Sequence, residues 1–143
     1  MTDFLLLNNE VPEAVNLAAV AIAREYGVKV ILNPAPARAL PDELKKSVFL
    51  FTPNEFEEES LELKAEVITT LGAKGCRIGS TGEVIPAPAA KPVDSTGAGD
   101  TFNAVLAVRL AEGETLHDAC VAANEAAARS VAVKYVMPSL PRR

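Results

Sequence analysis

The first 32 residues alternate between two hydrophobic periods, and this alternation constrains the fold more than any other feature. Phe4–Leu7 is a continuous apolar run of strand length, and apolar residues then recur at helical spacing between Pro12 and Gly27. Proline suits the first turn of a helix, and glycine suits the left-handed residue after its last turn. A second apolar run covers Val28–Leu32. Two strands joined by a helix pair in parallel with a right-handed crossover.

The same alternation continues along the chain. We predict further elements in this order: helix Pro41–Lys46, strand Val48–Phe51, strand Val67–Leu71, hairpin Cys76–Ile85, and helices Thr101–Ala111 and Leu116–Val133. The sequence therefore predicts one α/β domain over residues 1–143 with a largely parallel sheet. In such sheets the loops after the strands gather at one edge, where ligands bind.

Charge and hydropathy exclude several partners. The net charge is −5, and the 14 Lys and Arg residues are scattered. Because binding to a phosphate backbone needs a basic field, we expect no nucleic-acid partner. The apolar runs are strand-sized, and the amino terminus lacks the pattern of a secretory signal, so we expect no membrane partner and a cytoplasmic location.

The cysteines and the single histidine offer no catalytic pattern. Cys76 and Cys120 lie far apart without metal-ligand spacing, and we expect buried, reduced thiols. His117 lies early in a predicted helix, and we expect it to be exposed rather than catalytic.

The segment Asp94–Asp100, with the sequence DSTGAGD, carries the clearest chemical signal. Small residues just before an apolar helix let the backbone approach a ligand. We expect the N–H groups of Gly97, Ala98, Gly99 and Asp100 to bind an anion at the positive end of the helix. Asp100 would then stand beside a phosphoryl group as a proton acceptor.

From these residues alone a plain helix cap at Asp100 remains an equal alternative. Two familiar phosphate motifs do not fit. Phe102 occupies the third glycine position of a dinucleotide fingerprint, and neither Gly-Lys-Ser nor Gly-Lys-Thr occurs for a P-loop.

Four blocks, in order, resemble the ribokinase-like, or PfkB, carbohydrate kinases. They are Asn33–Ala37 (NPAPA), Thr52–Glu55 (TPNE), Thr70–Gly75 (TLGAKG) and Asp94–Phe102 (DSTGAGDTF). The last block is similar to the second signature of that family, and the resemblance runs from Phe4 to Ser139. It implies a ribokinase-like three-layer α/β/α fold. An unrelated flavodoxin-like domain would share the strand pattern but leave the four blocks unexplained.

The resemblance implies roles for the glycine turn and its aspartate. Asp100 matches the general base for the primary hydroxyl of a sugar, and Gly97, Ala98 and Gly99 match the anion hole. Glu10 matches a residue that contacts the sugar, and together with the NPAPA block it favours ribose over other sugars.

The resemblance also implies an ATP site. Asn54 and Glu57 fit an Asn-x-x-Glu pattern that positions the phosphates of ATP and hydrated Mg²⁺, with Glu57 acting through water. Thr70, Gly72 and Gly75 match the nucleotide loop, although a plain hairpin turn is the alternative.

Three further positions complete the implied ligand set. Asn124 matches a residue near adenine, with a surface helix asparagine as the alternative. Asp94 and Thr96 match positions around a site for a monovalent cation, K⁺.

The acidic residues next to Glu57 have no implied role. Glu55, Glu58 and Glu59 are expected to face solvent.

The match departs from the family in extent. The sequence resembles the carboxy-terminal half of a member, without the amino-terminal half that holds the sugar-binding segments and the lid. The stretch between Asn54 and Val67 is also shorter than in the family. Bulky Tyr135 replaces a small residue beside the expected nucleotide and cation loop. A missing final helix is expected to leave an apolar sheet face that favours a homo-oligomer.

Two functions follow from this comparison. The first is ATP-dependent phosphorylation of a sugar, ribose above all, assisted by a complementary amino-terminal half. The second is an inactive remnant, or a nucleotide-binding half that needs a partner chain.

Overall fold

The computed structural model describes residues 3–133, which form a single sheet of six strands in sequence order. The strands are β1 Phe4–Asn8, β2 Lys29–Asn33, β3 Leu50–Phe51, β4 Glu66–Thr70, β5 Cys76–Ile78 and β6 Val84–Ile85. Strands β1 to β4 pair in parallel, and β5 and β6 continue the sheet as antiparallel strands. The predicted parallel sheet and its terminal hairpin are confirmed.

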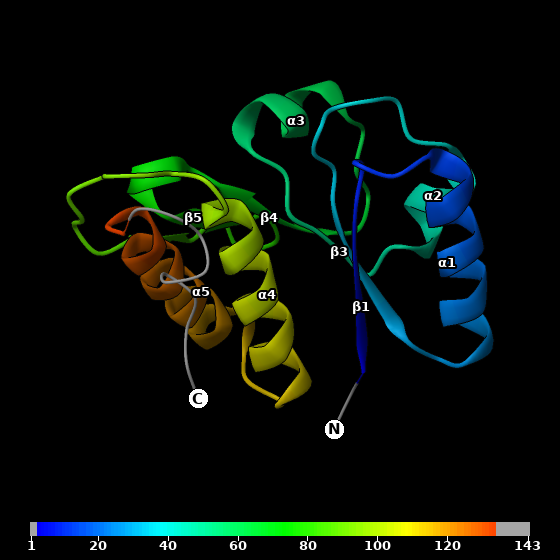
Figure 1. Cartoon of the computed structure of the whole chain (residues 1–143). Helices are drawn as coiled ribbons and strands as arrows, with labels where there is room; N and C mark the ends of the chain where they lie inside the picture. Colours follow the sequence, from blue (N-terminus) through cyan, green and yellow to red (C-terminus); the bar gives the residue numbers. More distant parts are fainter. Residues whose placement is uncertain (1–2, 134–143) are drawn as a thin grey trace.

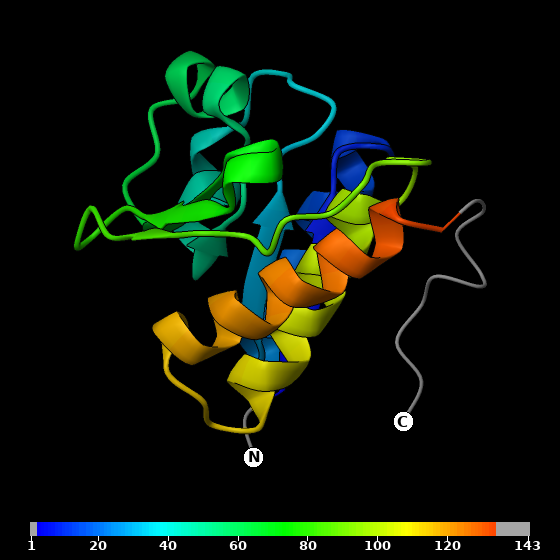
Figure 2. The ribbon, with the colours of Figure 1, turned by 90° about the vertical axis from the view of Figure 1, so that its left-hand side faces the viewer.

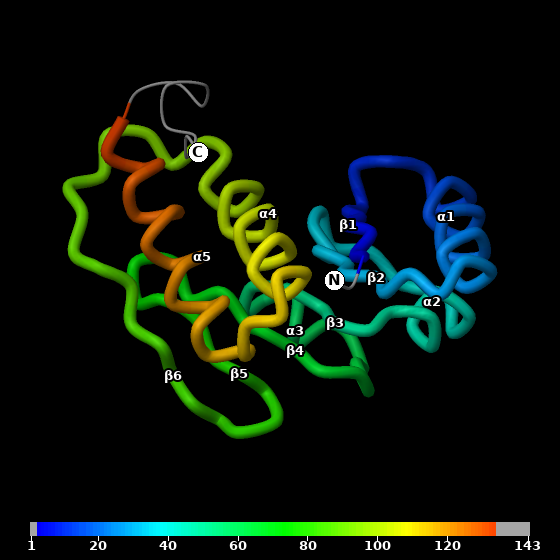
Figure 3. Tube along the Cα trace, turned by 90° about the horizontal axis from the view of Figure 1, so that it is seen from below, coloured from blue at the N-terminus to red at the C-terminus, as the bar shows by residue number. Residues whose placement is uncertain are grey.

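The helices form two layers, one on each face of the sheet (Figures 1 and 3). Their bounds are α1 Glu13–Glu25, α2 Asp42–Ser47, α3 Glu55–Ser60, α4 Ala98–Ala111 and α5 Leu116–Val131, with a 3₁₀ turn at Gly72–Lys74. Helices α1 and α2 lie on one side of the sheet, and α4 and α5 lie on the other. The described chain therefore has the predicted three-layer α/β/α arrangement.

Alternate residues of the buried strands point to different layers. Ile31 of β2 belongs to the hydrophobic cluster that includes residues of α4 and α5. Its neighbours Val30 and Leu32 belong to the cluster that includes residues of α1 and α2. The side chains of a strand point alternately to opposite faces, so one continuous apolar run supplies both cores. Both faces carry helices in residues 3–133, and the apolar face expected from the missing final helix stays a prediction.

Helices α4 and α5 form an antiparallel pair across one face of the sheet (Figure 2). They pack closely on each other, and α4 also contacts β1 at the far end of the sheet from the hairpin. The amino end of α4 lies at the upper edge in Figure 1, toward which β1 runs. The chain thus brings the DSTGAGD segment to the edge formed by the carboxyl ends of the parallel strands.

Several predicted boundaries differ from the structure. Helix α4 begins at Ala98, three residues before the predicted start, because Gly97 turns the chain directly into the helix. Helix α3 was not predicted as a helix, because its acidic residues show no apolar period. It forms because Asn54 caps it and its first-turn carboxylates favour the positive helix end.

No helix of the described residues is long and apolar enough to cross a membrane. The predicted departure at Tyr135, and the end of the resemblance at Ser139, lie outside the described residues.

The centre of the sheet should dominate the stability of the chain. Ile68 of β4 is fully buried in the cluster beneath α4 and α5, so Ile68→Ala should lower the free energy of unfolding by about 2–5 kcal/mol. Val84→Ala on β6, where the side chain is 53% exposed, should change it by less than about 0.5 kcal/mol. Urea denaturation of the two variants measures the difference. Equal losses would contradict the central position of β4.

Candidate active site

Helix α4 begins in a tight glycine turn. Gly97 has a left-handed φ of 77°, and its carbonyl accepts from the Thr101 N–H at 2.9 Å, which closes the first helical turn. The Ala98 N–H donates to the Ser95 carbonyl at 3.2 Å. The expectation that the Ala98 N–H is free for an anion is therefore wrong for this structure.

The remaining donors of this turn stay available. Within residues 3–133, the N–H groups of Gly97, Gly99 and Asp100 meet no acceptor. Such groups carry the positive end of the helix dipole and favour an anion. The turn therefore keeps three of the four predicted N–H donors.

Gly99 has no structural need to be glycine. A Cβ built on it would meet no atom within 4 Å, and its φ lies outside the left-handed range. In contrast, Gly97 requires its positive φ. Among the described residues neither φ nor packing requires glycine at position 99, and glycine leaves this backbone open to the close approach of another molecule.

Asp100 stands in the first turn of α4 and is exposed. The residue at the capping position is Gly97, and no side chain caps the helix. The alternative that Asp100 serves only as a helix cap therefore lacks the hydrogen bond it needs. The carboxylate is available to a ligand at the helix end.

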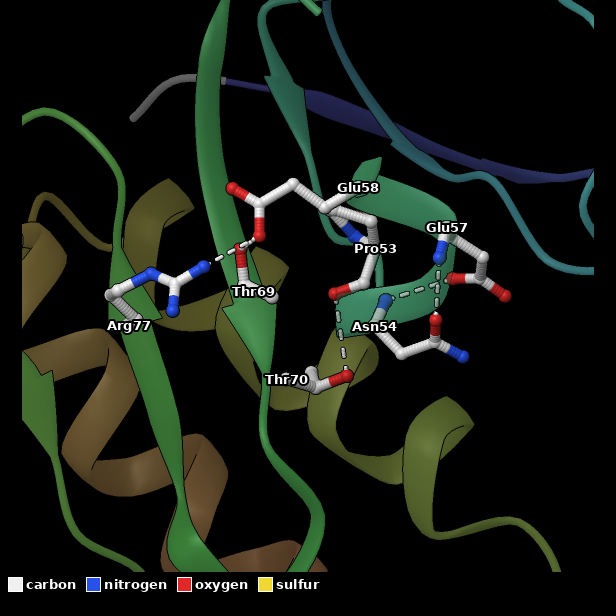
Figure 4. Close-up of polar contacts among 7 residues, drawn as sticks. All are labelled: Pro53, Asn54, Glu57, Glu58, Thr69, Thr70 and Arg77. Atoms are coloured by element: carbon white, nitrogen blue, oxygen red, sulfur yellow. Dashed lines mark hydrogen bonds and ion pairs between the residues drawn. The ribbon is translucent and has the colours of Figure 1, made fainter. Parts of the chain in front are cut away.

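Asn54 and Glu57 form a reciprocal capping box at the start of α3 (Figure 4). The Asn54 Oδ1 accepts from the Glu57 N–H at 2.8 Å, and the Glu57 Oε2 accepts from the Asn54 N–H at 2.8 Å. Glu57 is buried, with 6% of its surface exposed. The Asn-x-x-Glu spacing therefore has a structural role, and each side chain keeps a second polar atom for a ligand.

Glu58 does not face solvent, contrary to our expectation. Its Oε2 accepts from the Thr69 hydroxyl at 2.7 Å and from the Arg77 guanidinium at 2.6 Å (Figure 4). Both groups are partly buried, so the ion pair ties α3 to β4 and β5. Glu55 and Glu59 are exposed as predicted. The sequence could not pair Glu58 with Arg77, because 19 positions separate them.

Thr70 and Asn54 lie side by side at the ends of neighbouring strands, joined by an isolated parallel bridge. The Thr70 N–H donates to the Pro53 carbonyl at 2.8 Å, and its hydroxyl contacts the same oxygen at 3.4 Å. The structure therefore brings the second and third family-like blocks together.

Gly75 and Gly72 are glycines for different reasons. Gly75 has φ 104°, and a Cβ there would lie 2.0 Å from the Ile85 carbonyl oxygen. Gly72 also has a positive φ, of 60°, but a Cβ would meet nothing within 4 Å. Gly75 thus packs against the strand of the hairpin, and Gly72 is exposed.

Asn124 is buried rather than on the surface, so the surface alternative is wrong. Its Nδ2 donates to the Ile85 carbonyl at 3.0 Å and contacts the Cys76 Sγ at 3.6 Å. Its amino group therefore holds the hairpin against α5. The donors of the Asn124 side chain are thus engaged by the hairpin.

The two cysteines meet beside Asn124 as free, buried thiols, as predicted. The hydrogen bond with the Cys120 thiol lowers the pKa of Cys76, while burial opposes this effect. The same hydrogen bond and burial raise the pKa of Cys120. Both thiols belong to the core between the hairpin and α5.

The segment before the glycine turn is tied to the end of α5. The N–H groups of Val93 and Asp94 both donate to the Val131 carbonyl, at 2.7 and 3.0 Å. The Asp94 Oδ1 accepts from the Thr96 N–H at 2.9 Å. Among the described residues no cluster of three or more His, Cys, Asp or Glu side chains forms a metal site.

Two predicted residues lie apart from these clusters. Glu10 is exposed on the loop after β1, at the same edge of the sheet. His117 is half-exposed, as predicted, and its Nδ1 contacts Glu83 at 2.9 Å, near the β5–β6 turn. It has no part in the candidate site.

Known proteins match this chain over almost its whole length. The family profile described as pfkB family carbohydrate kinase matches residues 2–143. Ribokinases of Bacillus subtilis and Haemophilus influenzae are each 38% identical, and the matches cover 99% of this chain. They cover 53% and 54% of the two relatives. The chain therefore spans about half the length of the curated relatives it matches.

Solved structures give the same result. A ribokinase from Thermotoga maritima superposes with a TM-score of 0.84 at 32% identity, over 97% of this chain and 53% of that one. The Arabidopsis thaliana ribokinase complexed with ribose and ATP gives a TM-score of 0.85 at 33% identity, over 96% of this chain and 52% of that one.

The two glycines of the loop after β4 should respond differently to alanine. Gly75→Ala combines a forbidden backbone conformation with a clash against Ile85, so it should lower the free energy of unfolding by about 2–4 kcal/mol. Gly72→Ala meets no atom and should cost only about 1 kcal/mol. Urea denaturation monitored by circular dichroism measures both. A larger loss in Gly72→Ala would contradict this packing of the loop on β6.

Proposed function

This chain belongs to the pfkB family of carbohydrate kinases, and on that premise we propose that it supplies the nucleotide-binding and catalytic half of an ATP-dependent sugar kinase. The substrate we propose is ribose, phosphorylated on its primary hydroxyl to ribose 5-phosphate. The ribokinase relatives and the position of Glu10 on the sheet edge support this choice. Because the chain spans about half of those relatives, we propose the complete activity only for these residues together with the half that they do not cover.

The observation that carries this proposal is the glycine turn at the start of α4. It combines N–H donors that meet no acceptor in residues 3–133 with an exposed carboxylate one residue after Gly99. Glycine at position 99 is required neither by packing nor by φ. A phosphoryl group bound against this backbone accounts for all three features.

We assign the chemistry as follows. The carboxylate of Asp100 accepts the proton of the sugar hydroxyl while that oxygen forms a bond to the γ-phosphorus of ATP. The bond from this phosphorus to the bridging oxygen breaks, and ADP leaves. The N–H groups of Gly97, Gly99 and Asp100 stabilise the negative charge on the transferring oxygens.

ATP would lie over the loops that follow β3 and β4. We assign the contacts with ATP to residues at two neighbouring strand ends. They are Asn54 after β3, and Thr70, Gly72 and Gly75 at the end of β4 and in the loop after it. Asn124 acts through the hairpin that it holds.

Two cations complete the proposed site. Mg²⁺ fits Glu57 through water, because one carboxylate oxygen remains outside the capping box and Mg²⁺ keeps several waters in phosphate sites. K⁺ would bind by the Asp94–Thr96 turn through backbone carbonyls, as the family resemblance implies. The cytoplasmic location stays a prediction.

The complementary half has a surface to which it could pair. In the described sheet β1 is an edge strand, and Leu6 on it is 38% exposed. Beside it lies an apolar hollow of about 430 Å³ between β1 and α1, where Ile22 and Tyr26 are 58% and 73% exposed. An unpaired apolar edge of this kind pairs readily with another strand. A homo-oligomer through the same edge is the competing arrangement.

A second candidate function is a nucleotide-binding half without turnover. It is favoured by the coverage of about half of each relative and by the exposure of Asp100, since phosphoryl transfer needs water to be excluded from the site.

The primary test is ribose-dependent ADP formation with Mg²⁺ and K⁺. The purified chain is assayed alone and mixed with the part of the Bacillus subtilis ribokinase that the match leaves uncovered. Asp100→Asn should lower the rate about 10²- to 10⁴-fold, because it removes the proton acceptor. Asp118→Asn is the matched control, since Asp118 is an exposed aspartate in the first turn of α5. Turnover that survives in Asp100→Asn would contradict the proposed base. ATP binding without turnover in either preparation would favour the second candidate.

Gly99→Ala should separate stability from activity. Alanine meets no atom at this position and favours a helix, so the free energy of unfolding should stay unchanged or rise by up to about 1 kcal/mol. The added methyl group would stand where we place the phosphoryl group, so ribose-dependent ADP formation should fall. Urea denaturation and the same assay measure the two effects. Full activity in a stable Gly99→Ala variant would exclude close approach of the phosphoryl group to this backbone.

A further inference from the structure

The loop after β1 is held more tightly than an exposed surface loop requires. Counted from Asn8, the last residue of β1, to Val11, its third residue is Glu10, to which we assigned the sugar contact. The Glu10 side chain is exposed. Its own N–H donates to the Asn8 Oδ1 at 2.9 Å, so the backbone at Glu10 is ordered from the start of the loop.

Arg38, in the segment after β2, forms two hydrogen bonds with this loop. One nitrogen of its guanidinium, Nη1, donates to the Asn9 carbonyl at 3.1 Å and to the Val11 carbonyl at 2.9 Å. These two carbonyls flank Glu10 in the chain. A planar guanidinium with fixed donors therefore holds the backbone on both sides of one residue.

Asn9, in the loop itself, donates hydrogen bonds to the segment after β2. Its N–H donates to the Ala35 carbonyl at 3.0 Å, and its Nδ2 donates to the Pro36 carbonyl at 3.1 Å. From α1, the Nδ2 of Asn16 donates to the Asn8 carbonyl at 2.8 Å. The loop is thus joined to the NPAPA segment and to α1 by side chains that are themselves mostly buried.

This arrangement leaves four buried polar atoms without a partner in the described chain. The Oδ1 atoms of Asn9 and Asn16, and Nε and Nη2 of Arg38, are buried without a partner among the described residues. Unpartnered buried polar atoms are destabilising, and in natural proteins they call for a reason beyond packing. Such local costs concentrate at functional sites, where a group must be held in place.

We propose that Arg38 and Asn9 are positioning residues of the sugar site, which fix the loop Asn8–Val11 so that Glu10 presents its carboxylate to the hydroxyl groups of the sugar. This inference rests on the proposed function, in which Glu10 binds the sugar. It adds the residues that act through Glu10 and explains why the NPAPA segment lies beside the sugar loop. Neither Arg38 nor Asn9 takes part in the ATP site.

The test compares Arg38→Met with Arg24→Met. Arg24 is exposed, and its guanidinium also makes a hydrogen bond, to Ser47 at the opposite edge of the sheet. Hydrogen exchange of the backbone amides of residues 9–11 should become faster in Arg38→Met and stay unchanged in Arg24→Met. In the ribose assay described above, Arg38→Met should raise the KM for ribose about tenfold or more, because misplaced contacts weaken binding steeply. The KM for ATP should not change.

A double-mutant cycle with Glu10→Ala shows whether Arg38→Met changes the KM for ribose through Glu10. If Arg38 acts through Glu10, Arg38→Met should have little further effect on the KM for ribose once Glu10 is alanine. An equal effect in both backgrounds, unchanged hydrogen exchange, or a parallel rise in the KM for ATP would overturn the proposal. Absence of ribose-dependent turnover in both the wild type and Arg24→Met would instead contradict the proposed function, and the sugar role of the loop with it.

Discussion

Parallel pairing of β1 to β4 is the constraint on which the rest of the structure depends. The register joins Leu5 to Val30 and Leu6 to Ile31, and from Ile31 it continues through Leu50 to Glu66. Because all four strands run the same way, the loops after them reach one edge of the sheet. The loops that carry Glu10, Asn54 and Thr70 therefore lie at the same edge, and the amino end of α4 lies there too. A single reversed strand would separate these residues.

The loops at this edge are held by contacts between distant parts of the chain. Asn124 binds the Ile85 carbonyl, Glu58 binds Arg77, and the Val131 carbonyl binds the segment before the glycine turn. In each case a hydrogen bond between two different elements gives a backbone group or a polar side chain its partner. Buried polar groups need such partners. The same bonds give the loops fixed positions. Order at the edge of the sheet therefore comes from the packing of the helices beneath it.

Several motif residues serve structure and ligand together. Asn54 and Glu57 cap a helix with two atoms and leave two others for a ligand. Gly97 is needed for its left-handed φ, Gly75 for its contact with β6, and Gly99 for neither reason. A motif therefore mixes positions that shape the turn with positions that neither φ nor packing requires. Only the contacts of each residue separate the two kinds.

The sequence by itself determined the parallel strands, the hairpin and the helix-end turn with Asp100, because hydrophobic period and glycine placement are local properties of the chain. The three-layer arrangement was implied by the family resemblance. It also predicted the buried thiols of Cys76 and Cys120. It did not predict helix α3, whose acidic residues lack an apolar period and whose stability comes from its cap.

Only the tertiary structure decided which polar groups are engaged. It buried Asn124, paired Glu58 with Arg77 and placed Arg38 around Glu10. These contacts join residues between 19 and 39 positions apart. Their formation depends on how strands and helices pack, and no local pattern in the chain records that packing.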